Sequence, residues 1–248
     1  MEQINPKIAI IGYGKMGKCI EDIAIKNNMN ITDIFDIDNM LCLNKIYDFD
    51  VAIDFSTPDS IMEHISILNK MKKNIVIGTT GWYDNLKQVE EDCKKSGNGV
   101  VWASNFSIGI QIFSKLVKEV ALLINRFEGY DIFMSELHHN NKIDSPSGTA
   151  KTIANIILEN NNRKTKINTE LLNRKIEPNE LHISSLRGGN IFGIHTVFVD
   201  SENDTIEIQH TAKNRNGLAT GAILAAKWIY NKTGFYNFAD ILDNILYK

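Results

Sequence analysis

The sequence predicts an α/β protein of two domains, one built on a parallel sheet and a smaller α+β domain with a largely antiparallel sheet. Two observations support this prediction. Over the first hundred residues, short apolar runs alternate with segments of helical periodicity, which is typical of parallel strands joined by crossover helices. Beyond residue 123, runs with partial period-2 alternation follow one another, which is typical of antiparallel strands.

The composition is that of an ordinary folded protein, with 43% hydrophobic and 23% charged residues among 248. The formal net charge of −3 provides no basic surplus, which disfavours a nucleic-acid binder. The longest apolar runs are far shorter than the roughly 20 residues of a membrane span. The first residues also lack a signal-peptide pattern, so we expect a cytoplasmic protein that binds neither nucleic acid nor membrane.

Each strand of the first domain is expected to end in a loop at one edge of the sheet, where open α/β folds bind ligands. The predicted strands are residues 7–11, 31–35, 51–55, 74–77 and 99–103. The predicted helices are residues 15–26, 58–71 and 84–96.

The second domain begins with a helix pattern after Ser107. Its predicted strands are residues 130–138, 181–187, 191–200 and 205–210, and residues 149–158 form a helix against the sheet. From Gly217 another helix pattern returns to the first domain. We therefore assign residues 1–107 and 217–248 to the first domain and residues 108–216 to the second.

A glycine-rich turn at residues 12–17 follows the first strand directly and opens the first helix, which is the context in which GxGxxG binds a dinucleotide. Gly12 permits the tight turn, Gly14 lets the backbone approach the pyrophosphate, and Gly17 allows close helix packing. The helix N-terminus then faces the phosphates, so Lys15 and Met16 belong to the same predicted Rossmann-type cofactor site.

Asp36 ends the second strand roughly 20 residues after the last glycine, where a carboxylate accepts hydrogen bonds from ribose hydroxyls. No Arg or Lys follows immediately to hold a 2′-phosphate, so the sequence favours NADH over NADPH, although Lys15 or Lys18 would soften that preference. A solvated carboxylate at a strand end is the alternative interpretation of Asp36.

Three further loops, which follow the third, fourth and fifth strands, are rich in small and hydroxyl-bearing residues. Such loops can pass under a nicotinamide ring and bond its carboxamide, although each alone is more often a simple strand-to-helix turn. The candidate residues in these loops are Phe55, Gly78, Thr79, Thr80, Ser104, Asn105 and Phe106.

The stretch from residue 136 to 150 contains most of the candidate chemistry of the second domain. The adjacent His138 and His139 point to opposite faces of a strand unless the strand ends there. Lys142 supplies a cation, and residues 147–149 begin a helix whose free amides would hold a carboxylate. A dicarboxylate ligand would suit these groups. No third ligand has convincing spacing to the two histidines, so we expect no metal.

This stretch resembles the signature of the 4-hydroxy-tetrahydrodipicolinate reductase family, also called dihydrodipicolinate reductase, of bacterial lysine and diaminopimelate biosynthesis. The similarity extends over nearly the whole chain, through residues 12–17, 54–58, 78–81, 104–107, 187–196, 207–212 and 215–222. The chain departs from the family pattern at Thr57, where members often carry Arg, and at Asn140 and Asn141, where they carry basic residues.

The resemblance implies an NAD(P)H-dependent oxidoreductase that reduces 4-hydroxy-tetrahydrodipicolinate to tetrahydrodipicolinate. The first domain would bind the dinucleotide, and residues 78–80 and 104–106 match the cofactor loops of the family, with Arg215 as a further contact. The second domain would bind substrate and build a homotetramer. His138 matches the proton donor and Lys142 a second catalytic residue that also binds a carboxylate, and either could supply the proton. The residues implied in substrate binding are His139, Lys142, Ser147, Gly148 and Thr149.

Two other functions stay open on the residues alone. Another two-domain NAD(P)-dependent dehydrogenase would need a Cys nucleophile or a different acid-base group, and none of Cys19, Cys42 and Cys93 follows a suitable loop. A non-catalytic redox sensor that binds NADH would leave the two histidines and Lys142 without a role. The sequence does not determine whether the substrate loses water on the enzyme.

Overall fold

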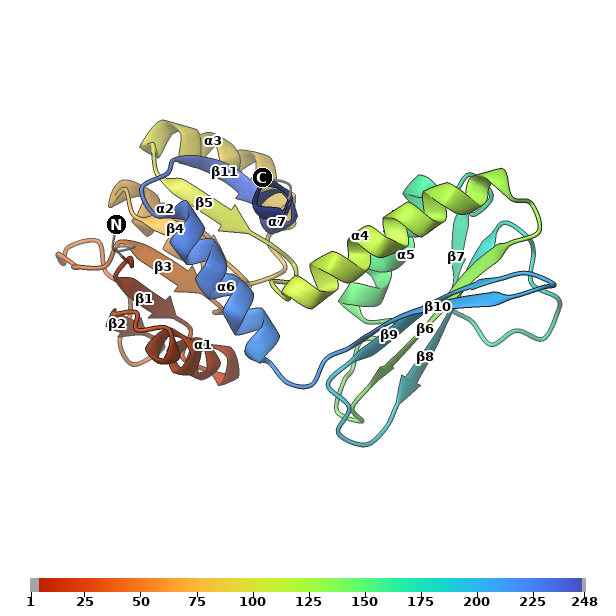
Figure 1. Ribbon diagram of the computed structural model, residues 1–248. Helices are drawn as coiled ribbons and strands as arrows, with labels where there is room; N and C mark the ends of the chain where they lie inside the picture. Colours follow the sequence, from red (N-terminus) through yellow and green to blue (C-terminus); the bar gives the residue numbers. More distant parts are fainter. Residues whose placement is uncertain (1–4, 247–248) are drawn as a thin grey trace. The chain divides into compact units, whose positions relative to one another are not determined.

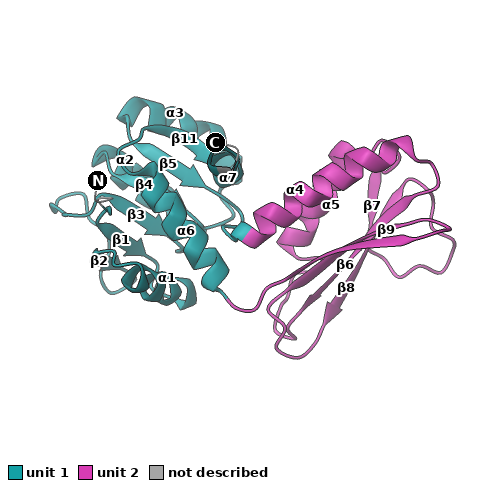
Figure 2. Ribbon diagram, viewed as in Figure 1, with its two compact units in different colours: residues 1–108, 215–248 teal, residues 109–214 magenta. Residues whose placement is uncertain are grey.

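The computed structural model describes residues 5–246, and the chain divides into two compact units (Figures 1 and 2). Unit 1 combines residues up to 108 with residues from 215 onward, and unit 2 is the continuous segment Gly109–Asn214. The chain therefore leaves unit 1 after its fifth strand and returns to it about a hundred residues later.

Unit 1 contains a sheet of six strands that are all parallel to their neighbours, in the order β11-β5-β4-β3-β1-β2. The central strands are near-continuous apolar runs because helices cover both faces of the sheet. The strands are β1 (Ile8–Ile11), β2 (Ile31–Phe35), β3 (Val51–Asp54), β4 (Asn74–Ile77), β5 (Gly99–Trp102) and β11 (Gly234–Asn237).

Alternate side chains of these strands enter two separate cores, as the pleat of a strand requires. Ile8 and Ile10 of β1 pack with α1 (Lys15–Lys26), α6 (Asn216–Ile229) and α7 (Phe238–Leu246). Ala9 and Ile11 face the opposite side, where the core is completed by the helices α2 (Ile61–Lys70) and α3 (Leu86–Ser96), the latter preceded by the short 3₁₀ turn η1 (Tyr83–Asn85). Unit 1 is thus a three-layer α/β/α arrangement whose strand ends share one edge.

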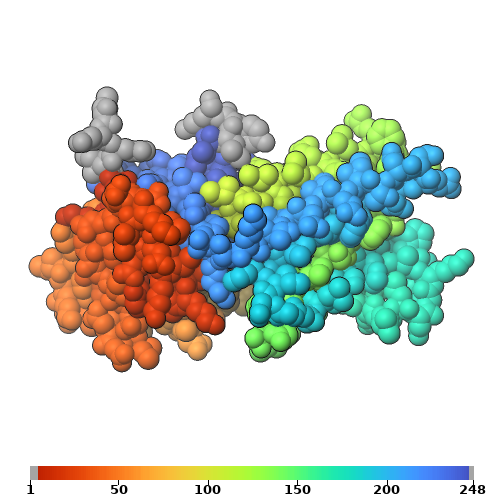
Figure 3. Space-filling view, turned by 60° about the horizontal axis from the view of Figure 1, so that its bottom comes forward, coloured from red at the N-terminus to blue at the C-terminus, as the bar shows by residue number. Residues whose placement is uncertain are grey.

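Unit 2 is a two-layer arrangement of a five-stranded sheet and two helices. The strand order is β10-β9-β6-β8-β7, and apolar residues of α4 and α5 pack on one face. The elements are α4 (Ile108–Leu123), η2 (Ile124–Arg126), β6 (Asp131–His138), α5 (Gly148–Asn160), β7 (Lys166–Asn168), β8 (Glu180–Arg187), β9 (Ile194–Asp200) and β10 (Thr205–Thr211). The edge strand β10 is largely exposed, and its blue segment is visible on the surface of unit 2 in Figure 3.

The predicted fold class is confirmed, and the structure adds details that the sequence patterns did not indicate. The second sheet is mixed, because β9 pairs antiparallel with β6 and β10 whereas β8 pairs parallel with β6 and β7. Strands β7 and β11 and helix α7 were not predicted. Among the described residues, no helix is both long and apolar enough to cross a membrane.

Candidate active site

In unit 1, the loops after several parallel strands pack around Phe55. A Cβ atom added to Gly12 would lie 2.6 Å from the Phe55 carbonyl oxygen, and one added to Gly78 would lie 2.2 Å from the Phe55 ring. The Phe55 and Phe106 ring centroids are 6.1 Å apart. The structure therefore brings together the loops that follow β1, β3, β4 and β5.

The three glycines of the turn at residues 12–17 differ in whether the backbone conformation and packing of the protein require a glycine. Gly12 has a φ of +87°, which side chains rarely adopt, and a Cβ on Gly17 would lie 2.4 Å from the Gly12 carbonyl oxygen. Gly14 has an ordinary φ of −83°, and a Cβ there would meet no atom of residues 5–246 within 4 Å. Packing explains Gly12 and Gly17, whereas Gly14 leaves open space at the start of α1.

That open space suits the pyrophosphate of a dinucleotide. Helix α1 begins after Gly14 with no capping side chain from the described chain and no acidic residue in its first turn. Its first amides and the positive end of its dipole are therefore presented to a ligand rather than to the protein. Lys15 is exposed and Met16 is half-buried at this end.

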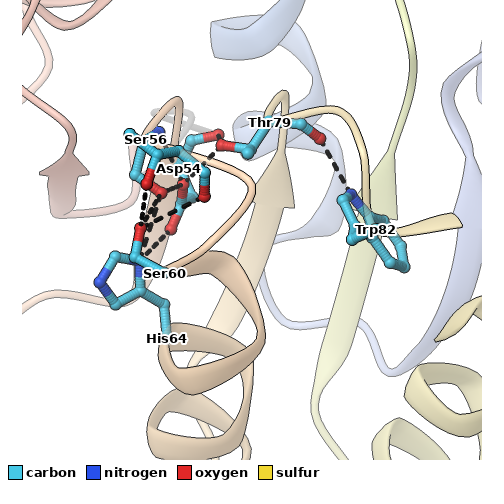
Figure 4. A network of polar contacts seen from close by, with 7 residues as sticks. Asp54, Ser56, Ser60, His64, Thr79 and Trp82 are labelled. Atoms are coloured by element: carbon cyan, nitrogen blue, oxygen red, sulfur yellow. Dashed lines mark hydrogen bonds and ion pairs between the residues drawn. The ribbon is translucent and has the colours of Figure 1, made fainter.

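A buried polar network joins the loops after β3 and β4 to helix α2 (Figure 4). Oδ1 of Asp54 accepts from the Ser56 amide at 2.9 Å, the Ser56 hydroxyl at 2.6 Å and the Thr79 hydroxyl at 2.9 Å. Oδ2 of Asp54 lies 2.8 Å from Nδ1 of His64. The Trp82 indole N–H donates to the Thr79 carbonyl at 2.9 Å. The Thr79 hydroxyl thus holds the loop in place, and it is the neighbouring Thr80 that is exposed.

Asp36 is exposed at the end of β2 and organises its own turn. Its Oδ1 accepts hydrogen bonds from the amides of Asp38 at 2.9 Å and Asn39 at 3.1 Å. The carboxylate is consequently held at the edge of the sheet, in the position that the sequence predicts for a ribose-binding residue.

The other predicted cofactor residues also belong to unit 1. Ser104 is exposed, and Oδ1 of Asn105 accepts from the Ser107 amide at 2.9 Å. Arg215 immediately precedes α6.

In unit 2, one face of β6 changes from apolar to polar along its length. Met134 belongs to the core, whereas Glu136 and His138, two and four residues later on the same face, are buried polar groups. The strand register places His195 of β9 opposite Glu136 and Arg187 of β8 opposite His138. The structure therefore gathers ionisable side chains from three strands at one end of the sheet.

The Glu136 carboxylate is at the centre of this cluster and is completely buried. One oxygen forms a hydrogen bond with Nδ1 of His138. The other accepts from the Arg187 guanidinium at 2.7 Å and from the Ser147 amide at 3.2 Å. Burial alone would raise the pKa of Glu136, but the hydrogen bonds to this carboxylate, of which that from Arg187 has the largest effect, together outweigh burial and hold this pKa below its usual range.

His138 and His195 lie against one another, with ring centroids 5.2 Å apart. Burial lowers the pKa of His138, and the Glu136 carboxylate opposes that shift. Burial lowers the pKa of His195 further, to about 4, so this ring is neutral at pH 7. Nε2 of His195 lies 3.1 Å from the Ser147 hydroxyl, which in turn accepts from the Ala150 amide at 3.1 Å and caps α5.

Lys142 lies on the turn between β6 and α5, where its Nζ is 2.7 Å from Oδ1 of Asp144. The other Asp144 oxygen accepts from the Gly148 amide at 3.3 Å. The sequence predicted free amides at the start of α5, whereas the structure places an internal carboxylate on the Gly148 amide. Burial would raise the pKa of Asp144, but the hydrogen bond and the charge of Lys142, together with hydrogen bonds from backbone amides, outweigh it and lower this pKa.

His139 follows the last residue of β6, so the rule that adjacent side chains face opposite sides of a strand ends there. It is half-buried, and its amide donates to the Ile191 carbonyl at 2.7 Å. Its Nδ1 is buried without a hydrogen-bond partner among the described residues.

The sequence analysis assigned no function to Glu136, Arg187, His195 or Asp144. Glu136 had a usable signal, because a residue two positions before His138 shares its face of a strand. Arg187 and His195 join the cluster through strand pairing, which local patterns do not reveal. Donor atoms of Glu136, His138 and His195 lie within 4.8 Å of one another, a grouping that could hold a metal ion. The bonds from Arg187 and His138 already satisfy both carboxylate oxygens.

Comparison with known proteins matches both parts of the chain to one family. A model described as "Dihydrodipicolinate reductase, N-terminus" matches residues 6–106, and one described as "Dihydrodipicolinate reductase, C-terminus" matches residues 109–242. A 4-hydroxy-tetrahydrodipicolinate reductase from Christiangramia forsetii is 39% identical over 240 residues, which cover 96% of this chain and 98% of that protein. One from Buchnera aphidicola is 38% identical and covers 94% of this chain and 81% of that protein.

A solved structure described as dipicolinate-bound dihydrodipicolinate reductase from Paenisporosarcina sp. TG-14 has the same fold, with a TM-score of 0.77. It is 23% identical in sequence, and the match covers 96% of this chain and all of that one.

Proposed function

The chain belongs to the dihydrodipicolinate reductase family, and from this premise we propose that it reduces 4-hydroxy-tetrahydrodipicolinate to tetrahydrodipicolinate with NADH or NADPH. The observation that carries the proposal is the cluster of Glu136, His138 and Arg187 beside the start of α5. Glu136 and His138 belong to the stretch that resembles the family signature. The reaction belongs to lysine and diaminopimelate biosynthesis.

The proposed cofactor site lies at the shared edge of the unit 1 sheet. The α1 amides and the space at Gly14 would hold the pyrophosphate, and Asp36 the ribose. The other proposed contacts are Gly12, Lys15, Met16, Gly17, Phe55, Gly78, Thr79, Thr80, Ser104, Asn105, Phe106 and Arg215. When bound, the reduced nicotinamide supplies a hydride. We expect NADH to be used at least as well as NADPH, because Asp36 and Asp38 repel a 2′-phosphate.

The residues of unit 2 would bind and protonate the substrate. Lys142 and the first amides of α5, at Gly148 and Thr149, would bind one carboxylate, and His139 would contribute to the same clamp. Nδ1 of His138 donates to Glu136, so Nε2 would carry the proton for transfer in the imidazolium form of the ring, which the Glu136 carboxylate favours. Reduction adds a hydride to one substrate carbon, and this proton would neutralise the negative charge that develops beside it.

Self-association is a further part of the proposal. On the side of the unit 2 sheet away from α4 and α5, Phe133 and Phe198 stack with centroids 5.0 Å apart. Phe133 is 36% exposed and Leu186 on the same face is 57% exposed. An apolar sheet face of this kind supports a homotetramer built through unit 2. NADH, NADPH and the small dicarboxylate substrate are water-soluble metabolites, which supports a cytoplasmic location.

The test is the oxidation of NADH by the purified protein in the presence of freshly generated 4-hydroxy-tetrahydrodipicolinate, followed by the loss of nicotinamide absorbance. NADPH is compared at the same salt concentration through kcat/KM. Turnover that depends on this substrate supports the proposal. NADH binding without turnover would instead favour a redox sensor, and a clear preference for NADPH would contradict the expected role of Asp36.

A further inference from the structure

The proposed carboxylate-binding groups of unit 2 already hold a carboxylate that belongs to the chain. Asp144 places Oδ1 at 2.7 Å from Nζ of Lys142, and its Oδ2 accepts from the Gly148 amide at 3.3 Å. The side chain therefore uses both oxygens, one on an ammonium group and one on a helix N-terminus, as a ligand carboxylate would. We refer to Lys142 and the Gly148 amide together as the carboxylate site.

Two carboxylates cannot bind at the carboxylate site together without a loss of binding energy. The Gly148 amide has a single hydrogen and so donates to one acceptor at a time. The Lys142 ammonium has more donors, but two carboxylates held side by side on it would repel each other. A substrate carboxylate bound at the carboxylate site must therefore replace Asp144.

Asp144 is well placed to leave. Its side chain is 52% exposed and lies on the turn between β6 and α5, outside the apolar core of unit 2. The Asp144 side chain does not bond to Glu136, whose oxygens are bonded to Arg187, Ser147 and His138. Only the Asp144 backbone carbonyl contacts the cluster, where it accepts from Arg187 at 2.6 Å, and a rotation of the side chain leaves this bond intact. Displacement of the Asp144 carboxylate therefore leaves the His138 geometry in place.

We propose that Asp144 is an internal competitor whose carboxylate occupies the carboxylate site in the free enzyme and is displaced by the carboxylate of the substrate. This inference rests on the proposed function of the same residues. Asp144 lowers the apparent affinity for every ligand of the carboxylate site, because only the fraction of molecules in which this site is open can bind. It also selects for acids, since a neutral analogue has no group to replace it on Lys142.

The first test is the binding of dipicolinate, a planar dicarboxylate, to the full-length wild type and to Asp144→Asn by isothermal titration calorimetry. We expect Asp144→Asn to bind dipicolinate more tightly by roughly 3- to 30-fold, the ratio that corresponds to one partly exposed ion pair and one charge-assisted hydrogen bond. The matched control is Glu202→Gln, which removes one negative charge at the exposed turn between β9 and β10 and should leave affinity unchanged. Asp144→Ala serves as a second variant, and circular dichroism checks the fold of each.

Equal or weaker binding by both Asp144 variants would overturn the inference, because a residue that merely orients Lys142 would weaken binding when it is lost. Since the removal of a nearby negative charge also favours an anion, a crystal structure of the wild type with dipicolinate decides the mechanism. We expect a dipicolinate carboxylate on Lys142 and the Gly148 amide, with Asp144 turned away. An intact contact between Lys142 and Asp144 in that complex would overturn the displacement. A wild type that neither binds dipicolinate nor reduces the proposed substrate would instead refute the proposed function.

Discussion

His138 holds its Nδ1 against the Glu136 carboxylate, and this hydrogen bond determines which ring nitrogen is left for a ligand. A Cβ added to Gly193 would lie 2.9 Å from Nε2 of His138, so a glycine at that position keeps the nitrogen uncovered. Arg187 keeps Glu136 ionised, and the ionised carboxylate in turn favours a protonated imidazole. Arg187 is therefore bonded to Glu136 and Glu136 to His138, and the last of these residues is the proposed proton donor.

At the residue scale, replacement of His138 by Gln should lower kcat by roughly 10² to 10⁴, the range for loss of a positioned proton donor. The affinity for NADH should stay the same, because the proposed cofactor residues belong to unit 1. Steady-state kinetics and NADH fluorescence titration measure the two effects. A decrease in kcat of less than tenfold would assign the proton to Lys142 or to water.

Glu136→Gln should act through His138 and lower kcat by roughly 10- to 10³-fold, less than loss of the imidazole itself. Glu136 raises the pKa of His138 against the effect of burial, so its neutral replacement should lower that pKa further. A general acid works only while it is protonated. As pH rises, the activity of Glu136→Gln should therefore decline at a lower pH than the activity of the wild type. The pH profile of kcat measures this shift, and an unchanged profile would reduce Glu136 to a packing role.

At the scale of elements, the sequence predicted the strands that are buried on both faces, because these are runs of apolar residues. Strands β7 and β11 lie at sheet edges and are not apolar runs, and their three and four residues are too few to show an alternation instead. The sequence indicated those residues of the candidate site that lie close together along the chain, such as His138 and Lys142. Arg187 and His195 enter it through the register of β8 and β9, which depends on the whole sheet.

Substitutions of two glycines in the turn before α1 should have different effects on stability and on NADH binding. Gly14→Val should fold with wild-type stability, since a Cβ there meets nothing within 4 Å, but should lose NADH binding because the side chain fills the pyrophosphate path. Gly17→Val should lower the free energy of unfolding by several kcal/mol, since its Cβ would lie 2.4 Å from a backbone oxygen. Denaturant unfolding and NADH titration of both variants test this. A Gly14→Val protein that binds NADH normally would refute the phosphate assignment.

At the scale of the whole molecule, stability should depend on pH through the buried His195. Its pKa is about 4 in the folded chain, below the ordinary value of 6.5, so the unfolded chain binds a proton first as pH falls. The stabilisation is complete above pH 6.5 and is lost as pH decreases towards 4, by about 2 kcal/mol between pH 7 and pH 4.5.

His195→Gln should lose this part of the pH dependence while it keeps a polar partner for Ser147. Unfolding is best followed by far-UV circular dichroism, because Trp82, Trp102 and Trp228 all lie in unit 1 and their fluorescence does not report on unit 2. Equal slopes of unfolding free energy against pH in the wild type and the variant would show that His195 does not titrate as described.

The return of the chain to unit 1 from residue 215 onward also has a consequence for protein synthesis. Helix α6 supplies Ala219, Ala222 and Ile229 to a core whose strands are made more than a hundred residues earlier. At about 5–20 residues per second, the ribosome needs roughly 2–7 s to add the segment that follows unit 2. During that interval unit 2 has its full sequence, whereas one face of the first sheet is covered by α1 and still lacks α6 and α7. This apolar face is therefore the last to be covered, and it is there that we expect a chaperone to bind.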